Sequence, residues 1–388
     1  MPFDFEQAPH REGTNSVKWD VAKGELPMWV ADMDFAVAPV IKQALQQRLD
    51  QDAYGYNEIP ASFGQTIANW WQKRHQLKLD PAWVLFSAGV IPSISSTVRK
   101  LTHPGDNVVV LTPVYNIFYN SIRNNQRQIL TSELSYQDGA YKIDFADLEE
   151  KLARANTSLM IFCNPHNPIG KVWDRATLTR VGELCLRYHV VLLSDEIHCD
   201  LTHPGHDYVP MLSLTPAIAA NTIMCVSATK AFNIAGIQTS AIVIPDPRLR
   251  QLVDRQINTD EVAEPNTFAI QALEAAFNEG GPWLDALNQY LAGNRRLLQD
   301  FLAEKVPEVS LIPSEATYLA WLDCQQICQD SEELAHAIRQ ETGLFLTAGE
   351  VYGGNGAQFL RWNYACPRAR LQDGLNRFAQ AVENYRGE

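Results

Sequence analysis

Short apolar runs alternate with helical patterns through the middle of the chain. The runs at 107–111, 159–163 and 222–226 consist almost entirely of apolar residues. An apolar run without alternating polar positions is typical of a strand covered on both faces, as in a parallel sheet. Similar short runs lie at 84–86, 190–194 and 240–244. With a helical pattern at 175–188 between two of these runs, the sequence predicts an α/β fold with a mostly parallel sheet between helices.

Helical patterns flank this region on both sides. Apolar positions recur at helical spacing from about 39 to 50, and again through Ile67, Trp70 and Trp71. Beyond Pro282 the chain turns helical, then continues as a smaller α+β unit with strands near 317–322 and 358–364 and a helix near 332–340. A chain of 388 residues is long enough for two domains. The predicted division is an N-terminal arm and helix packing with the small domain (1–48), a large domain (49–284) and a small C-terminal domain (285–388).

Polar residues follow three of the predicted strands at the point where each strand ends. The stretch Asn-Pro-His-Asn-Pro-Ile-Gly at 164–170 follows one run, Asp195 follows the next, and Ser-Ala-Thr-Lys at 227–230 follows a third. Open α/β sheets bind their ligands beyond the carboxyl ends of the strands. The layout therefore predicts a functional site at this edge.

Lys230 is the central residue of that site. An unpaired ammonium is costly to bury, and the position makes chemical sense if the amine forms a Schiff base with a carbonyl cofactor. Taken alone, Lys230 could instead be a snorkelling lysine at a strand end. In the same way, Asp195 could cap a turn and Asn167 could belong to an Asn-Pro turn.

Charge and composition narrow the classes of partner. The net charge of −13 argues against nucleic acid or an anionic membrane surface. No apolar run approaches the roughly 20 residues that span a bilayer, and the N-terminus lacks the pattern of a signal peptide. The seven cysteines are odd in number and scattered, which predicts reduced core residues of a cytoplasmic protein.

One cluster of possible metal ligands needs separate treatment. One cysteine, one aspartate and three histidines lie within nine residues of the sequence: His198, Cys199, Asp200, His203 and His206. Their spacing matches no common tetrahedral zinc site. Pro204 and Gly205 would also scatter the side chains, so we predict no metal.

The strand-end motifs, together with Arg361, resemble fold-type I pyridoxal-phosphate enzymes of the aminotransferase class I/II superfamily. The resemblance covers nearly the whole chain and keeps the order and approximate spacing of the motifs. It implies a large domain with a seven-stranded-type sheet. The stretches 26–35, 54–56 and 359–368 resemble more narrowly the MalY/PatB branch, whose members are similar to cystathionine β-lyases and other C–S lyases.

The resemblance implies roles for the residues around the cofactor ring. Lys230 would hold the cofactor aldehyde and later act as the base at Cα, and Asp195 would pair with the pyridine nitrogen. Asn167 would donate to the phenolate oxygen and lie beside the substrate. His198 falls where many relatives have a tyrosine that reaches the same oxygen. Tyr115 would stack on the ring.

The resemblance also implies a phosphate site. Gly89, Val90 and Ile91 at a strand-to-helix turn would supply backbone donors, and Ser227 would add a hydroxyl. Many aminotransferases have an arginine eight residues after the lysine, where this chain has Gln238. This departure points away from the standard aminotransferases.

Three residues and one subunit contact complete the predicted site. Arg361 would clamp the substrate α-carboxylate, assisted by the backbone around Val30 and Ala31. Tyr56 would reach the phosphate from the neighbouring subunit, which implies a homodimer.

The function implied by this resemblance is β-elimination from L-cystathionine or a related S-substituted cysteine. The products would be a thiol such as homocysteine, pyruvate and ammonia, which places the reaction in methionine biosynthesis. Two alternatives stay open. An aminotransferase would share these residues and need only a keto acid, with Gln238 the main hint against it. A regulatory binding module would be expected to lose Lys230 or Asp195, and both are present.

Overall fold

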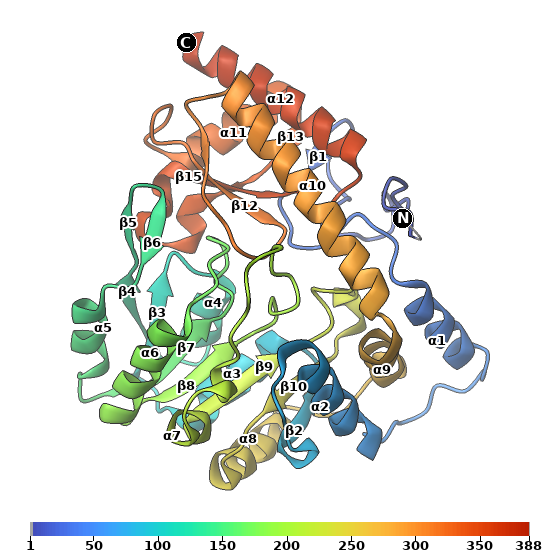
Figure 1. The fold of residues 1–388 in the computed structure, drawn as a ribbon, viewed down its shortest axis with the longest axis vertical. Helices are drawn as coiled ribbons and strands as arrows, with labels where there is room; N and C mark the ends of the chain where they lie inside the picture. The colour runs from blue at the N-terminus through green and yellow to red at the C-terminus, as the bar shows by residue number, and fades with distance from the viewer. Residues whose placement is uncertain (1–2, 388) are drawn as a thin grey trace.

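A seven-stranded sheet forms the centre of the computed structural model, which describes residues 3–387 (Figure 1). The strand order is β2-β10-β9-β8-β7-β3-β4. Strand β10 runs antiparallel to β2 and β9, and the other neighbours are parallel. The strands are Val84–Ser87 (β2), Asn107–Thr112 (β3), Gln128–Glu133 (β4), Thr157–Cys163 (β7), Val191–Asp195 (β8), Thr222–Val226 (β9) and Ser240–Val243 (β10). The predicted α/β class with a mostly parallel seven-stranded sheet is confirmed.

Helices cover both faces of this sheet, which explains why its strands lack alternating polar positions. Val108 and Val110 of β3 pack into one apolar cluster with α3, α4 and α8, whereas Val109 and Leu111 pack into another with α5, α6 and α7. These helices are Val90–Leu101 (α3), Ile117–Arg123 (α4), Phe145–Leu152 (α5), Arg175–Arg187 (α6), Pro216–Ala220 (α7) and Pro247–Thr259 (α8).

A second sheet lies in the upper part of Figure 1. It has four strands in the order β11-β12-β15-β14. Helices α10, α11 and α12 belong to this part of the fold, and the longest, α10, reaches from α9 to α12. The elements are Ser310–Leu311 (β11), Leu319–Asp323 (β12), Thr347–Ala348 (β14), Phe359–Asn363 (β15), Ala269–Glu279 (α9), Gly281–Lys305 (α10), Ser331–Thr342 (α11) and Arg368–Gly387 (α12).

The N-terminal region contacts both parts. Strand β1 (Leu26–Pro27) pairs in parallel with β13 (Leu344–Phe345) beside the second sheet. Helix α1 (Pro39–Leu49) packs against α9, and α2 (Ala61–His75) also contacts α9. The predicted boundary at 284/285 falls inside α10, and the one at 48/49 falls at the end of α1. The division into domains stays a prediction.

The pattern of the sequence missed the more polar elements. Edge strand β4 reads Gln-Ile-Leu-Thr-Ser-Glu and is largely exposed, so it lacks the continuous apolar run of its neighbours. The strands of the hairpin, β5 (Ser135–Gln137) and β6 (Ala140–Lys142), have only three residues each and also lack an apolar run.

Two further observations bear on the environment of the chain. None of the helices in the described part combines the length and apolar character needed to cross a membrane. All seven cysteines are free and buried.

Candidate active site

A cavity of about 270 Å³ lies at the carboxyl ends of the parallel strands, where the sequence predicted a site. One side is formed by strand ends and the turns that follow them, and the other by the segment around Ala31. Its walls bring together these predicted residues: Ala31, Gly89, Val90, Ile91, Tyr115, Asn167, Asp195, His198 and Lys230.

Lys230 follows β9 and reaches the segment on the opposite side. Its Nζ donates a hydrogen bond to the carbonyl oxygen of Ala31 at 2.5 Å. Burial, with a smaller contribution from the positive charge of Arg361, lowers the pKa of Lys230 to about 8. The lowered pKa makes the neutral, nucleophilic amine available nearer to neutral pH.

Asp195 is the last residue of β8 and is only 4% exposed. Its Oδ1 accepts a hydrogen bond from the Ile197 N–H at 3.1 Å. Burial raises the pKa of the Asp195 carboxyl to about 7, against which the charge of Lys230 acts weakly. A protonated ring nitrogen placed beside this carboxylate would stabilise its charged form.

Arg361 of β15 lies against Asn167. One guanidinium nitrogen donates to Asn167 Oδ1 at 3.2 Å, and the other to the carbonyl oxygen of Trp29 at 3.0 Å. Arg361 is 5% exposed, and it forms no ion pair with any carboxylate in residues 3–387. A buried guanidinium without an acidic partner suits a ligand carboxylate.

Another group of lining residues suits an anion. Helix α3 starts at Val90 with Gly89 as its N-cap, and Gly89, Val90 and Ile91 all line the cavity, so the N-terminus of the helix lies at the cavity wall. The buried Thr239 Oγ1 lies in the same wall and has no hydrogen-bond partner within the structure. Gln238 occupies the position where many aminotransferases have an arginine, and it also lines the cavity.

Ser227 is placed differently from its neighbours. Its hydroxyl donates to the Thr239 carbonyl at 2.6 Å and accepts from the Thr229 N–H at 3.0 Å. Thr229 itself lines the cavity. The hydroxyl of Ser227 therefore braces the turn, and its predicted contact with a phosphate stays a prediction.

His198 and Tyr115 also line the cavity. His198 is buried, and its Nδ1 has no partner among the described residues. Burial and the charge of Lys230 lower the pKa of His198 to about 3, so the ring is neutral. Burial raises the pKa of Tyr115, which keeps its hydroxyl protonated.

Four predicted residues do not line the cavity: Arg361 and Ser227, described above, and Val30 and Tyr56. The Val30 carbonyl accepts a hydrogen bond from Asn363 Nδ2 at 2.6 Å, so its backbone is fixed next to Ala31. Tyr56 is fully exposed on the segment between α1 and α2. A single chain does not bring Tyr56 to the cavity, and its predicted role needs a second copy.

Sequence reasoning assigned no role to several residues at the site. Thr229 and Thr239 line the cavity, and Tyr318 donates to the same Ala31 carbonyl as Lys230. Thr229 stood within the quoted Ser-Ala-Thr-Lys stretch and carried a usable signal. Tyr318 lies in an apolar run and looks like an ordinary core residue, so nothing in the pattern distinguished it.

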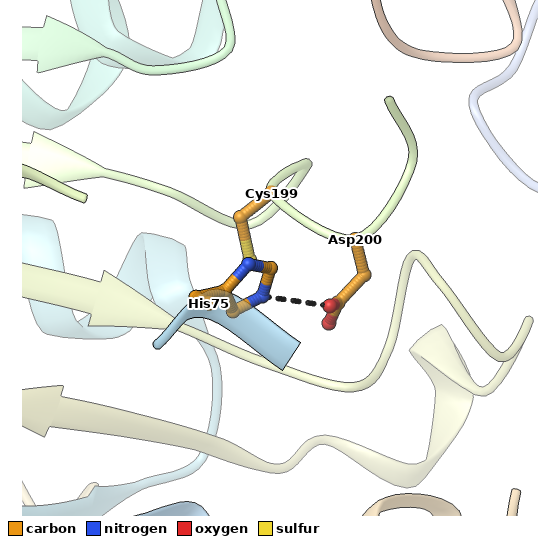
Figure 2. Close-up of side chains that lie close together, drawn as sticks. All are labelled: His75, Cys199 and Asp200. Carbon is orange, nitrogen blue, oxygen red and sulfur yellow. Dashed lines mark hydrogen bonds and ion pairs between the residues drawn. The ribbon is translucent and has the colours of Figure 1, made fainter. Parts of the chain in front are cut away.

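The cluster considered as a metal site is rearranged in three dimensions. Cys199 and Asp200 lie beside His75 of α2, with one potential ligand atom of each within 4.8 Å of the others (Figure 2). Asp200 accepts hydrogen bonds from His75 Nε2 at 2.9 Å and from Trp70 Nε1 at 3.0 Å. His203 lies apart, with its ring nitrogens on backbone carbonyls.

This cluster borders a hollow of about 730 Å³, larger than the cavity at Lys230. The hydrogen bonds to Asp200 tie α2 to the loop that carries His198, which is a sufficient structural reason for the cluster. The larger hollow contains none of the strand-end residues. We therefore place the chemistry in the smaller cavity, and the absence of a metal stays a prediction.

Comparison with known proteins identifies the family. Residues 26–378 match the model of aminotransferase class I and II, and the chain belongs to that family. It is 42% identical to cystathionine beta-lyase PatB of Bacillus subtilis, over 98% of this chain and 100% of the relative. It is 32% identical to protein MalY of Escherichia coli, over 99% and 100%.

A solved structure agrees with these relatives. Cystalysin from Treponema denticola, which contains a pyridoxal 5'-phosphate cofactor, superposes with a TM-score of 0.96 at 33% identity. The match covers 99% of this chain and 100% of that one. The resemblance inferred from the strand-end motifs is confirmed.

Proposed function

We propose that the chain is a pyridoxal-phosphate-dependent carbon–sulfur β-lyase that acts on L-cystathionine or a related S-substituted cysteine. The observation that carries the proposal is the amine of Lys230, which shares one cavity with the buried carboxyl of Asp195 and with Asn167, the residue that accepts a hydrogen bond from the Arg361 guanidinium. The names of the relatives, a cystathionine beta-lyase and cystalysin among them, support the same activity.

The residues present fit both the ring and the phosphate of pyridoxal phosphate. Asp195 suits the protonated ring nitrogen, and Asn167 and His198, whose Nδ1 has no partner among the described residues, line the same cavity and suit the phenolate oxygen. The start of α3 and the unpartnered Thr239 Oγ1 suit the phosphate. When bound, the cofactor supplies an electron sink that stabilises negative charge at the substrate Cα.

The chain's own residues would then bind the substrate and move the proton. Arg361 holds the α-carboxylate and, through Asn167, fixes its position relative to the ring. Lys230 takes the proton from Cα, because its lowered pKa lets the amine act as a base near neutral pH. The Cβ–S bond breaks with both electrons going to sulfur, and the remaining fragment is hydrolysed to pyruvate and ammonia.

A product assay tests this function. The cofactor-loaded protein is incubated with L-cystathionine and no keto acid, and pyruvate and free thiol are measured. We expect both in equal amounts, their loss in Lys230→Ala, and their retention in Lys171→Ala, a lysine paired with Glu315 outside the cavity. Turnover that appears only when a keto acid is added would show an aminotransferase instead.

We propose in addition that two copies of the chain share their active sites. Large apolar side chains are exposed together near α1 and the segment that follows it: Leu49, Tyr54, Tyr56 and Ile59. Burying this segment against a second copy would remove apolar surface from water and bring Tyr56 toward the partner's phosphate end.

Hybrid dimers test the shared site. Lys230→Ala and Tyr56→Ala proteins are each expected to have little activity, and a mixture refolded together should regain it. One site of each hybrid then combines an intact Lys230 with an intact Tyr56 from the other chain. If the mixture stays as inactive as its parts, Tyr56 does not act across an interface.

The seven buried free thiols support a reducing compartment, and we propose the cytoplasm. Cell fractionation followed by immunodetection would check this location.

A further inference from the structure

Two donors share one buried carbonyl at the edge of the cavity. The Ala31 oxygen accepts a hydrogen bond from Lys230 Nζ at 2.5 Å and another from Tyr318 Oη at 3.0 Å. Tyr318 is 1% exposed and its ring packs edge-on against His198, with centroids 6.5 Å apart. Because Tyr318 does not line the cavity, its hydroxyl acts on the site through Ala31.

The backbone before Tyr318 is strained, and other groups hold it. Thr317 has a φ of +73°, which is rare for a β-branched residue. Its N–H donates to the Leu201 carbonyl at 2.8 Å. Its carbonyl accepts from Tyr364 Oη at 2.8 Å and is 2.9 Å from His203 Nε2. Strain that several hydrogen bonds maintain is a feature of functional sites, and here it aims Tyr318 at Ala31.

Lys230 is a donor that must leave this carbonyl. When its nitrogen condenses with a carbonyl compound, water is released and the nitrogen keeps at most one N–H. Its hydrogen bond to Ala31 is then lost or weakened. A buried carbonyl left without a donor is costly, so a second donor favours the state in which the lysine has departed.

We infer that Tyr318 is a positioning residue that keeps the Ala31 carbonyl hydrogen-bonded while Lys230 is attached to the cofactor. The inference rests on the proposed function because the cofactor is what draws the amine away. Two donors on one oxygen also compete, so the tyrosine weakens the hold of the carbonyl on the lysine ammonium. Removing the hydroxyl therefore favours the free lysine over the cofactor-bound one.

A double-mutant cycle separates this role from a merely structural one. The dissociation constant for pyridoxal phosphate is measured for the wild-type chain, Tyr318→Phe, Lys230→Ala and the double variant. In the Lys230 background we expect Tyr318→Phe to weaken cofactor binding about tenfold, because a buried carbonyl loses its remaining donor. In the Lys230→Ala background the same change is expected to have almost no effect, because no amine leaves the carbonyl.

An equal loss of affinity in both backgrounds would show that the hydroxyl only stabilises the fold. No loss in either would also overturn the inference. Tyr141→Phe is the matched control, because Tyr141 is another buried tyrosine whose hydroxyl contacts Asn355 and Trp321 away from the cavity. It is expected to bind the cofactor like the wild-type chain.

A second measurement uses the cofactor-free protein. The rate at which Lys230 captures pyridoxal phosphate is followed against pH, and Tyr318→Phe is expected to move the midpoint to higher pH. The physical reason is that the carbonyl, relieved of its second donor, holds the ammonium form more strongly. An unchanged midpoint contradicts the inference. A wild-type chain that captures no cofactor would instead refute the proposed function.

Discussion

The two sides of the cavity are held in place by different means. On the sheet side, Asp195 and Asn164 lie at the ends of paired strands, and the Asn164 N–H donates to the Asp195 carbonyl at 2.9 Å. On the other side, the segment from Trp29 to Phe35 lies beyond β1 and belongs to no helix or strand. Its carbonyls accept hydrogen bonds mainly from side chains.

Those side chains come from all over the chain. The Trp29 carbonyl accepts from Arg361 and Thr347, the Val30 carbonyl from Asn363, and the Ala31 carbonyl from Lys230 and Tyr318. The Asp32 carbonyl accepts from Lys18 and Asn363, the Met33 carbonyl from Asn233 and Arg11, and the Phe35 carbonyl from Asn233. Sheet pairing uses backbone groups that every residue has, whereas this segment depends on particular side chains. Single substitutions are therefore expected to act differently on the two sides.

The largest effect is expected on the sheet side, from Asp195→Asn. An amide cannot keep the ring nitrogen protonated, so we expect kcat to fall by more than about 100-fold. The backbone of β8 is unaffected by the change, so the fold should survive. Steady-state kinetics of the cofactor-loaded variant measures the loss, and activity within tenfold of wild type would contradict the assigned role.

The same substitution is expected to stabilise the cofactor-free protein. Burial raises the pKa of Asp195 to about 7 from its ordinary value of 3.8, so the charged form is penalised in the folded state. Asp195→Asn should thus raise the free energy of unfolding by roughly 2 kcal/mol above pH 7. The gain should shrink as pH falls from 7 toward 4 and vanish below the unfolded-state pKa of 3.8, where the carboxyl becomes protonated in both states. Urea unfolding at several pH values measures it.

Arg361→Lys affects both sides of the cavity at once. Lysine keeps the charge but cannot donate to a carboxylate, Asn167 and the Trp29 carbonyl in one planar arrangement. We expect KM for the amino-acid substrate to rise about 30-fold, with a smaller fall in kcat. Arg295→Lys, a change in α10 away from the cavity walls, is the control. Equal kinetics for the two variants would exclude Arg361 as the carboxylate clamp.

Asn363→Ala tests the side-chain-held segment directly. Asn363 Nδ2 donates to the carbonyls of Val30 and Asp32 at 2.6 and 2.5 Å, and the Asn363 side chain is buried. Losing both donors should lower the free energy of unfolding by about 2–3 kcal/mol and raise KM more than it lowers kcat. Asn221→Ala, which removes one side-chain bond to the Val190 carbonyl at the sheet, should leave KM unchanged. A KM that stays constant in Asn363→Ala would show that the segment is fixed by other contacts.

What the sequence predicted follows the same division. The sequence could single out the strand-end residues Asn167, Asp195 and Lys230, which line one cavity, because an apolar run marks each strand and the polar residue after it marks the edge. Strand β4 was not predicted, because an exposed edge strand has no such apolar run.

The segment-side contacts could not be predicted from the pattern. Tyr318 and Asn363 lie hundreds of residues from the carbonyls they contact, and both sit in apolar runs. His75 meets Asp200 in the same way, across 125 residues. Such pairs depend on how distant parts of the chain pack together. The spacing of apolar residues in the sequence predicts local helices and strands, but it does not predict that packing.

The smallest effect, and the finest comparison, concerns the pKa of Lys230, which both sides influence. The negative charges of Asp32 on the segment and Asp195 on the sheet both raise it, and the contribution of Asp32 is the larger. In the cofactor-free protein, the rate of pyridoxal phosphate capture should rise with pH and level off above about 8, because the neutral amine is the nucleophile. Asp32→Asn should move this midpoint to lower pH, and by at least as much as Asp195→Asn. A larger shift from Asp195→Asn would mean that the sheet side, and not the segment that receives the lysine's hydrogen bond, sets the protonation of the amine.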